Sequence, residues 1–145
     1  MGKTMLDKDV ASVLENVKML QHAFEELTLE RGETINILGT TVHMERDKKR
    51  ASITQKRFVD KLKETYKIPK TSVAPATGDL LYEKEDSKVL GDQRKYMSLN
   101  ATLMYASKRT YPKISFPVVY LASKYNKATE DDYSKAMRVA EYIVG

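Results

Sequence analysis

The positive charge of this chain is concentrated in one stretch, and phosphate binding is the chemistry that such a stretch favours. Ten Lys or Arg and only three Asp or Glu lie between Arg46 and Lys70, whereas the whole chain has a net charge of +5. This local excess leaves the remaining sequence slightly negative. A concentrated cationic face favours a polyanion such as nucleic acid, or an anionic membrane surface. The cations that we expect to face the polyanion are Lys48, Lys49, Arg50, Lys56, Arg57 and Lys61.

A glycine falls inside the strand that we expect just before this basic stretch. Residues 34–46 alternate between apolar and polar types well enough to predict a strand, and Gly39 interrupts it. A glycine in a strand marks either a bulge or a place where another backbone or a ligand approaches closely. Both alternatives stay open on the sequence alone. The residues expected on the buried face of this strand are Ile35, Ile37, Val42 and Met44.

The basic residues fall on two elements that must hold them in place. Residues 47–49 predict a hairpin turn, followed by a short return strand over residues 51–53. Thr54 is a suitable N-cap for a helix over residues 55–66, whose apolar residues recur at four-residue steps. The lysines of this helix form either a solvated face or, together with the hairpin tip, an anion-binding edge.

Two further segments flank the basic stretch. Residues 9–30 carry the pattern of an amphipathic helix, which Asp9 or Ser12 can cap and Gly32 can close. A long connection over residues 71–91 follows the basic helix. A connection of this length is functional, mobile or wrapped over a surface, and its sequence pattern does not distinguish these roles.

The C-terminal part predicts three short helices, which is typical of a small antiparallel bundle. The first covers residues 92–108, Ser115 caps the second, and Thr129 begins the third with a capping box. The expected fold class is therefore α+β. A helix and a β-hairpin over residues 1–53 precede a helical subdomain over residues 54–145.

Catalytic and metal-binding patterns are missing from the sequence. The chain has no cysteine, and His22 and His43 lie far apart without further ligands nearby. It has no phosphate-binding glycine loop, no nucleophile elbow and no pair of carboxylates at catalytic spacing. No apolar run approaches the roughly 18 residues that a membrane span needs. We therefore expect an intracellular chain with no membrane span and no cofactor of its own, which is not a complete enzyme.

Several strings of this sequence resemble copia-type retrotransposon reverse transcriptases, in the region that follows the polymerase active site. The first is the strand over residues 37–42, continued by residues 53–62. Residues 96–106 are similar to that family's helix of the form Tyr-x-Ser-x-x-Gly-x-Leu-x-Tyr, and residues 109–114 resemble its Thr-Arg-Pro-Asp-Ile turn. Residues 136–145 are similar to the helix that precedes its ribonuclease H domain.

The resemblance implies a primer grip followed by a thumb. In that family the Leu-Gly strand pair holds the primer backbone, so the residues implied to do so here are Leu38, Gly39 and Thr40. The hairpin tip and the basic helix would contact duplex phosphates without reading their sequence. The family's Tyr-x-Asp-Asp motif, which binds catalytic magnesium, is absent, so this chain resembles the part beyond it. Asn100 replaces the family's glycine, and Lys113 replaces its aspartate.

Two functions are consistent with these observations. The first is a non-catalytic fragment of a copia-like reverse transcriptase, with no activity in isolation, that grips an RNA or DNA primer–template duplex through sequence-independent phosphate contacts. Its other partners would be the polymerase palm and the ribonuclease H domain. The alternative is a domesticated transposon remnant that serves as a protein-interaction module, with an exposed apolar patch on its last two helices. Salt should weaken the first kind of binding steeply and the second hardly at all.

Overall fold

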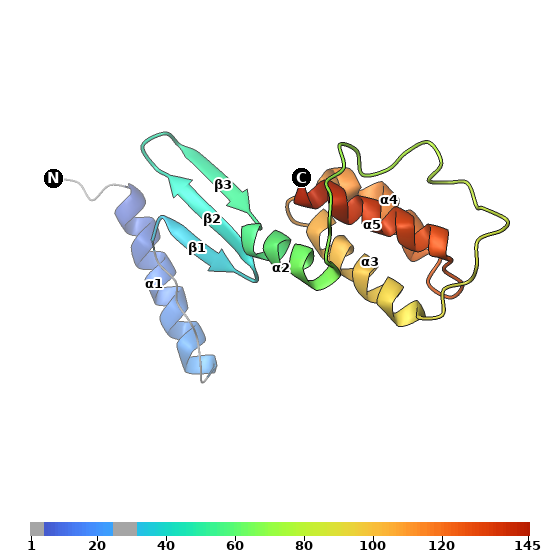
Figure 1. Ribbon diagram of the computed structural model, residues 1–145. Coiled ribbons are helices and arrows are strands. Elements are labelled where there is room, and N and C mark those ends of the chain that lie inside the picture. Colours follow the sequence, from blue (N-terminus) through green and yellow to red (C-terminus); the bar gives the residue numbers. More distant parts are fainter. Residues whose placement is uncertain (1–4, 25–31) are drawn as a thin grey trace. The chain divides into compact units, whose positions relative to one another are not determined.

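The first helix of the chain forms a unit of its own. A computed structural model describes residues 5–24 and 32–145, and the chain divides into two units, one that ends at Gly32 and one that begins at Glu33. Helix α1, Met5–Ala23, is the regular element of the first unit (Figure 1). The sheet and all the other helices belong to the second unit.

Helix α1 begins and ends earlier than its amphipathic pattern predicts. Asp9 and Ser12, the predicted N-caps, lie inside the helix, because the residues before Asp9 also favour helix. Gly32, predicted to close the helix, lies well beyond Ala23, although its φ of 141° is positive. Residues 25–30 of the predicted helix lie outside the described residues.

The second unit begins with a three-stranded antiparallel sheet in the order β1–β2–β3 (Figure 1). Its strands are β1 Thr34–Ile37, β2 Thr40–Glu45 and β3 Arg50–Thr54. Ile35 pairs with Val42, which in turn pairs with Ile53, so these three side chains lie on one face of the sheet. That face is the apolar one, and it stays partly open, since Ile53 is exposed.

The single strand predicted over residues 34–46 is in fact two strands joined by a turn. The break falls at Leu38 and Gly39, and Ile37 pairs with Thr40 across it. The bulge considered for Gly39 is therefore wrong: the glycine is the second residue of a two-residue hairpin turn. The residues predicted to share a face do share one, because the turn and the antiparallel pairing bring them together: Ile35, Ile37, Val42 and Met44. The prediction that this face is buried is wrong, because three of the four residues are only partly buried and Ile37 is exposed.

Helix α2, Lys56–Tyr66, leads from the sheet into the helical part of the unit (Figure 1). Its N-cap is Gln55 and not the predicted Thr54, and the Gln55 side chain makes no capping hydrogen bond. Gln55 is instead buried, with 3% of its surface exposed. The helix ends at Lys67, whose left-handed φ of 49° lets its amide bond to carbonyls of the last turn.

The long connection after α2 is attached along the helical bundle. Leu80 is buried in the hydrophobic core, and the amide of Leu90 donates to the Ala128 carbonyl at 2.9 Å. Between them, the Lys84 ammonium lies 2.9 Å from the Asp131 carboxylate. Of the roles left open by the sequence, the structure therefore shows a segment wrapped over a surface.

The helical bundle follows the predicted order. Its elements are α3 Gln93–Ser107, the 3-10 turn η1 Pro112–Ile114, α4 Ser115–Ala122 and α5 Glu130–Val144. Helix α5 starts with the predicted capping box: the Thr129 amide donates to the Asp132 carboxylate at 2.8 Å, and the Thr129 hydroxyl accepts from the Asp132 amide at 3.3 Å. Ser115 is the first residue of α4 and not its cap, which is Ile114.

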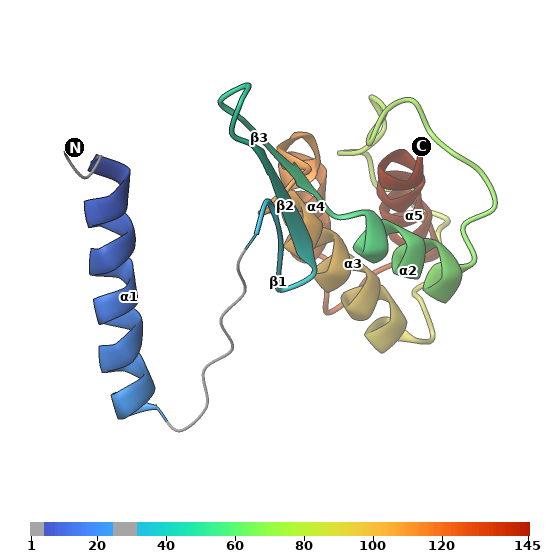
Figure 2. The same cartoon turned by 90° about the vertical axis from the view of Figure 1, so that its left-hand side faces the viewer.

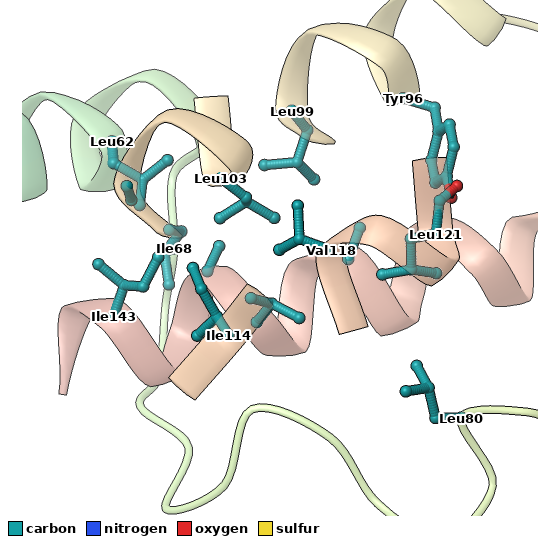
Figure 3. Packing of buried hydrophobic residues seen from close by; sticks show 14 of the residues in the cluster. Leu62, Ile68, Leu80, Tyr96, Leu99, Leu103, Ile114, Val118, Leu121 and Ile143 are labelled. Carbon is teal, nitrogen blue, oxygen red and sulfur yellow. The ribbon is translucent and has the colours of Figure 1, made fainter. Parts of the chain in front are cut away.

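The hydrophobic core lies among helices α2 to α5 (Figure 3). Its side chains come from every one of these helices, and they include Leu62, Leu103, Leu121 and Ile143. The fold is thus α+β, with a small sheet followed by helices, as predicted at that level. The division predicted between residues 53 and 54 falls inside the second unit.

Candidate nucleic-acid interface

The turn between β1 and β2 is formed by an exposed leucine, Leu38, and by Gly39. Leu38 has a φ of 49° and Gly39 a φ of 75°, which is the left-handed conformation that tight hairpin turns require. Glycine adopts it without strain, whereas a leucine there is uncommon. In the described part of the chain, the amides of Leu38 and Gly39 donate no hydrogen bond. Two N–H groups at this turn are therefore free to bind an acceptor.

Helix α3 holds this turn from one side. The Tyr105 hydroxyl donates a hydrogen bond to the Leu38 carbonyl. The same hydroxyl would lie 3.7 Å from a Cβ atom added at Gly39. This distance is an ordinary van der Waals contact, and the neighbouring group is a side chain of this chain, not the backbone or ligand considered for Gly39.

Thr40 differs from its two neighbours. It begins β2 and is 5% exposed, and its hydroxyl has no hydrogen-bond partner within the described residues. Of the three residues implied to hold a primer, the structure thus exposes Leu38 and Gly39 and buries Thr40.

The hairpin tip carries exposed cations at the end of the sheet away from α2 (Figure 2). Lys48 is held 3.0 Å from Glu45 in an ion pair at the surface. Lys49, with a φ of 50°, and Arg50 form no ion pair in the described part of the chain. The exposed ion pair between Lys48 and Glu45 contributes little to stability, so Lys48 can bind another anion instead at low cost.

Helix α2 divides its three predicted cations between two sides. Arg57 and Lys61 lie four residues apart and project from the same face, next to Phe58. Lys56 lies on another flank, where it lines a hollow together with Thr110. None of these three cations has an ion-pair partner among the described residues.

The structure therefore places the predicted cations in two groups and not on one continuous patch. The hairpin-tip group is Lys48, Lys49 and Arg50, and the α2 group is Lys56, Arg57 and Lys61. The strand β3, Arg50–Thr54, separates them, and five extended residues span roughly 17 Å. The turn at Leu38 and Gly39 lies at the α2 end of the sheet, where Tyr105 and Phe58 meet.

No protein-family model, curated protein or solved structure matches this chain significantly. The resemblance to copia-type reverse transcriptases therefore rests on the sequence strings alone.

A groove of about 290 Å³ lies between α2 and α3. Its polar lining residues are Lys61, Thr65, Tyr66, Ser98 and Thr102. The hydroxyls of Tyr66 and Ser98 share a 3.2 Å hydrogen bond, and the Thr102 hydroxyl donates to the Ser98 carbonyl at 2.8 Å. One cation among hydroxyl groups is a lining that suits a phosphate or a sugar.

Sequence reasoning missed the α3 side of this site. Ser98, Thr102, Tyr105 and Arg109 recur at steps of three and four residues, so one face of α3 and its C-terminal end carry all of them. The Arg109 guanidinium lies 5.5 Å from the centre of the Tyr105 ring. Their spacing could have predicted that they share one face of a helix. It could not have predicted the residues opposite that face, which are far away in the sequence.

The described residues contain neither a cluster of metal-ligand side chains nor a membrane-spanning helix. Nowhere among them do three His, Cys, Asp or Glu side chains gather as a metal site requires. None of the helices in those residues is long and apolar enough to cross a membrane. What the arrangement offers chemically is binding of an anion by amides, hydroxyls and cations.

Proposed function

We propose that this chain grips a primer–template duplex through its phosphates, as the primer grip and thumb of a copia-like reverse transcriptase would, without catalysing a reaction. One observation carries the proposal. The two free amides at Leu38 and Gly39 lie at the end of the sheet from which the cationic face of Arg57 and Lys61 begins. Free peptide amides beside unpaired cations favour the phosphates of a nucleic acid over a neutral partner.

The distribution of positive charge favours a nucleic-acid duplex as the ligand over a single phosphate ion. The hairpin-tip group and the α2 group are about 17 Å apart along β3. A duplex carries one negative charge per roughly 1.7 Å of its axis, so one duplex can reach both groups at once. A single small anion can neutralise only one of them. Contacts to phosphates alone carry no sequence information, so the proposed binding is independent of sequence.

Charge reversal of the two groups tests the proposal. One variant changes Lys48, Lys49 and Arg50 to Glu, and a second changes Lys56, Arg57 and Lys61 to Glu. The control variant makes the same change at Arg94, Lys127 and Arg138, which are exposed on α3, before α5 and on α5. All three variants alter the net charge equally, so any difference among them reports position and not total charge.

The measurement is the affinity for a labelled RNA–DNA hybrid of mixed sequence, followed by fluorescence anisotropy at several salt concentrations. We expect both site variants to lose at least tenfold in affinity and the control to lose much less. Equal losses in all three would show that only net charge matters, and the proposed surface would be wrong. Thermal unfolding of each variant checks that the fold is kept.

A second function draws on one specific observation. Phe116 and Val119 of α4 are 64% and 61% exposed, and they lie three residues apart on one side of the helix. Exposed apolar side chains in such a pair favour a protein partner. For the remnant that acts as a protein-interaction module, Phe116→Ser together with Val119→Ser should abolish partner binding, and salt should hardly affect that binding.

A further inference from the structure

The turn at Leu38 and Gly39 carries two carbonyls and two amides, and Tyr105 covers one of the carbonyls. The Tyr105 hydroxyl donates to the Leu38 carbonyl oxygen, whereas the amides of Leu38 and Gly39 have no acceptor among the described residues. An open carbonyl would repel an approaching phosphate. Tyr105 therefore occupies one of the two acceptors of the turn and leaves both donors free, which favours an anion over a cation.

Tyr105 is itself held in place from two sides. Its ring lies 5.5 Å from the ring of Phe58 in α2, at an interplanar angle of 46°. The Arg109 guanidinium lies 5.5 Å from the ring centre, one helical turn further along the chain. Leu38, Tyr105 and Arg109 thus form one continuous set of contacts, which joins the turn of the sheet to the end of α3.

Arg109 is poised to bind an anion at this place. Its side chain is exposed, and within the described part of the chain it forms no ion pair. A guanidinium held over an aromatic ring keeps N–H groups available for hydrogen bonds. Those groups match two oxygens of one phosphate, and a side chain that is already held in place loses less entropy on binding than a free one.

We infer that Arg109 is a phosphate ligand of this surface, that it acts beside the amides of Leu38 and Gly39, and that Tyr105 is the positioning residue for both. This inference rests on the proposed function and adds to it a site on α3. The ligand is a phosphate diester of a nucleic-acid backbone, bound between the turn and Arg109. Lys61 of α2 lines the groove between α2 and α3.

Three substitutions separate the roles. Arg109→Gln removes the charge, Arg109→Lys keeps the charge but loses the planar fork, and Tyr105→Phe keeps the ring but uncovers the Leu38 carbonyl. Arg138→Gln is the matched control, since Arg138 is also an exposed arginine but lies on α5, away from the turn. The probe is the labelled RNA–DNA hybrid, and each affinity is measured over a range of salt concentrations.

We expect Arg109→Gln to lower the affinity about tenfold and to make the salt slope shallower by about 0.9, the value for one lost phosphate contact. Arg109→Lys should keep the slope and lose about threefold in affinity. Tyr105→Phe should also keep the slope, because it removes no charge, while the affinity falls several-fold. Arg138→Gln should leave both quantities near those of the unchanged protein.

The amide resonances of Leu38 and Gly39 provide a readout that a purely structural role would not move. In the unchanged protein, both should shift when the hybrid is added, and the shifts should shrink in Arg109→Gln although its spectrum without ligand stays native. If the unchanged protein binds with a steep salt dependence and Arg109→Gln binds equally well, the inference is overturned and the proposed function stands. If the unchanged protein itself shows no salt-dependent binding, the proposed function fails, and the inference fails with it.

Discussion

The hydroxyl of Thr110 donates a 2.5 Å hydrogen bond to the side-chain oxygen of Gln55. This bond joins the N-cap residue of α2 to the segment that follows α3, at the place where the sheet meets the bundle. Gln55 is almost fully buried, and its side-chain nitrogen has no partner within the described residues. This hydrogen bond therefore holds the buried side chain of Gln55 where the sheet meets the bundle. That junction positions the candidate interface.

Gln55→Ala should destabilise the protein by about 1–3 kcal/mol, because it removes this bond and leaves a gap beside Thr110. The free energy of unfolding in urea measures the effect. Gln21→Ala, at an exposed site of α1, should change it by less than about 0.5 kcal/mol. Equal stability of the Gln55 and Gln21 variants would contradict the role given to the junction.

Tyr96→Phe should cost about 0.5–1.5 kcal/mol at neutral pH, the net value of one hydrogen bond. The buried Tyr96 hydroxyl donates to the Leu121 carbonyl at 2.6 Å, and in the variant that carbonyl keeps only its backbone donors, such as the Lys124 amide at 3.1 Å. The measurement is again denaturant unfolding, compared with Tyr82→Phe at an exposed tyrosine.

The same tyrosine should make stability depend on pH in alkali. Burial, helped by the charge of Asp132, raises the pKa of Tyr96. Since the folded protein then holds this proton more tightly than the unfolded chain, the stabilisation is present below the unfolded pKa of about 10 and is lost as the pH rises above it. Tyr96→Phe should flatten the fall in unfolding free energy above pH 10, and Tyr82→Phe should not. A parallel fall in all three proteins would argue against a buried, protonated Tyr96.

Asp131→Asn should weaken the attachment of residues 71–91 to the bundle, because it removes the ion pair with Lys84. Burial opposes ionisation of the Asp131 carboxyl, but hydrogen bonds from Lys135 and Lys84 outweigh it and lower the pKa. The stabilisation is therefore present above the unfolded pKa of about 3.9 and is lost as the pH falls through the folded pKa. Hydrogen exchange of the amides around Lys84 should accelerate in the variant at pH 7, and in the unchanged protein only in acid. Asp86→Asn, at an exposed position of the same connection, should leave exchange unchanged.

Gly39→Ala should destabilise the protein by about 1–2 kcal/mol, the cost of a side chain in the left-handed region. It should also lower the affinity for a duplex, because the methyl group is added at one of the two residues whose amides are proposed to bind phosphate. Gly91→Ala is the matched control, since its φ is not positive and no atom lies within 4 Å of the added Cβ. If the two variants behaved alike, neither the strain at Gly39 nor its part in binding would be supported.

Periodicity in the sequence predicted the helices well where one face of each is buried. The stripe of α2 and the capping box at Thr129 are local patterns, and the structure contains both. Helix ends were predicted less well. Gln55 takes the cap position of α2 in place of Thr54, because its side chain is bound by Thr110, and that contact joins residues 55 positions apart.

The turn at Leu38 shows why the candidate site could be predicted only in part. The alternation of residue types shifts by one position at Gly39, and a bulge and a two-residue turn both produce such a shift. A leucine in the left-handed region is uncommon, so its identity gave no sign of a turn. What stabilises the turn here is Tyr105, a residue 67 positions away, and no local pattern indicates that contact.

The central claim is most directly tested by the salt dependence of duplex binding in the unchanged protein. The logarithm of the affinity for a mixed-sequence RNA–DNA hybrid is plotted against the logarithm of the salt concentration. Because the hairpin-tip group and the α2 group each contact at least one phosphate in this account, we expect a slope of about −2 or steeper. Hybrids of different sequence should give the same slope and affinity. A slope near zero, or no binding at low salt, would contradict the account.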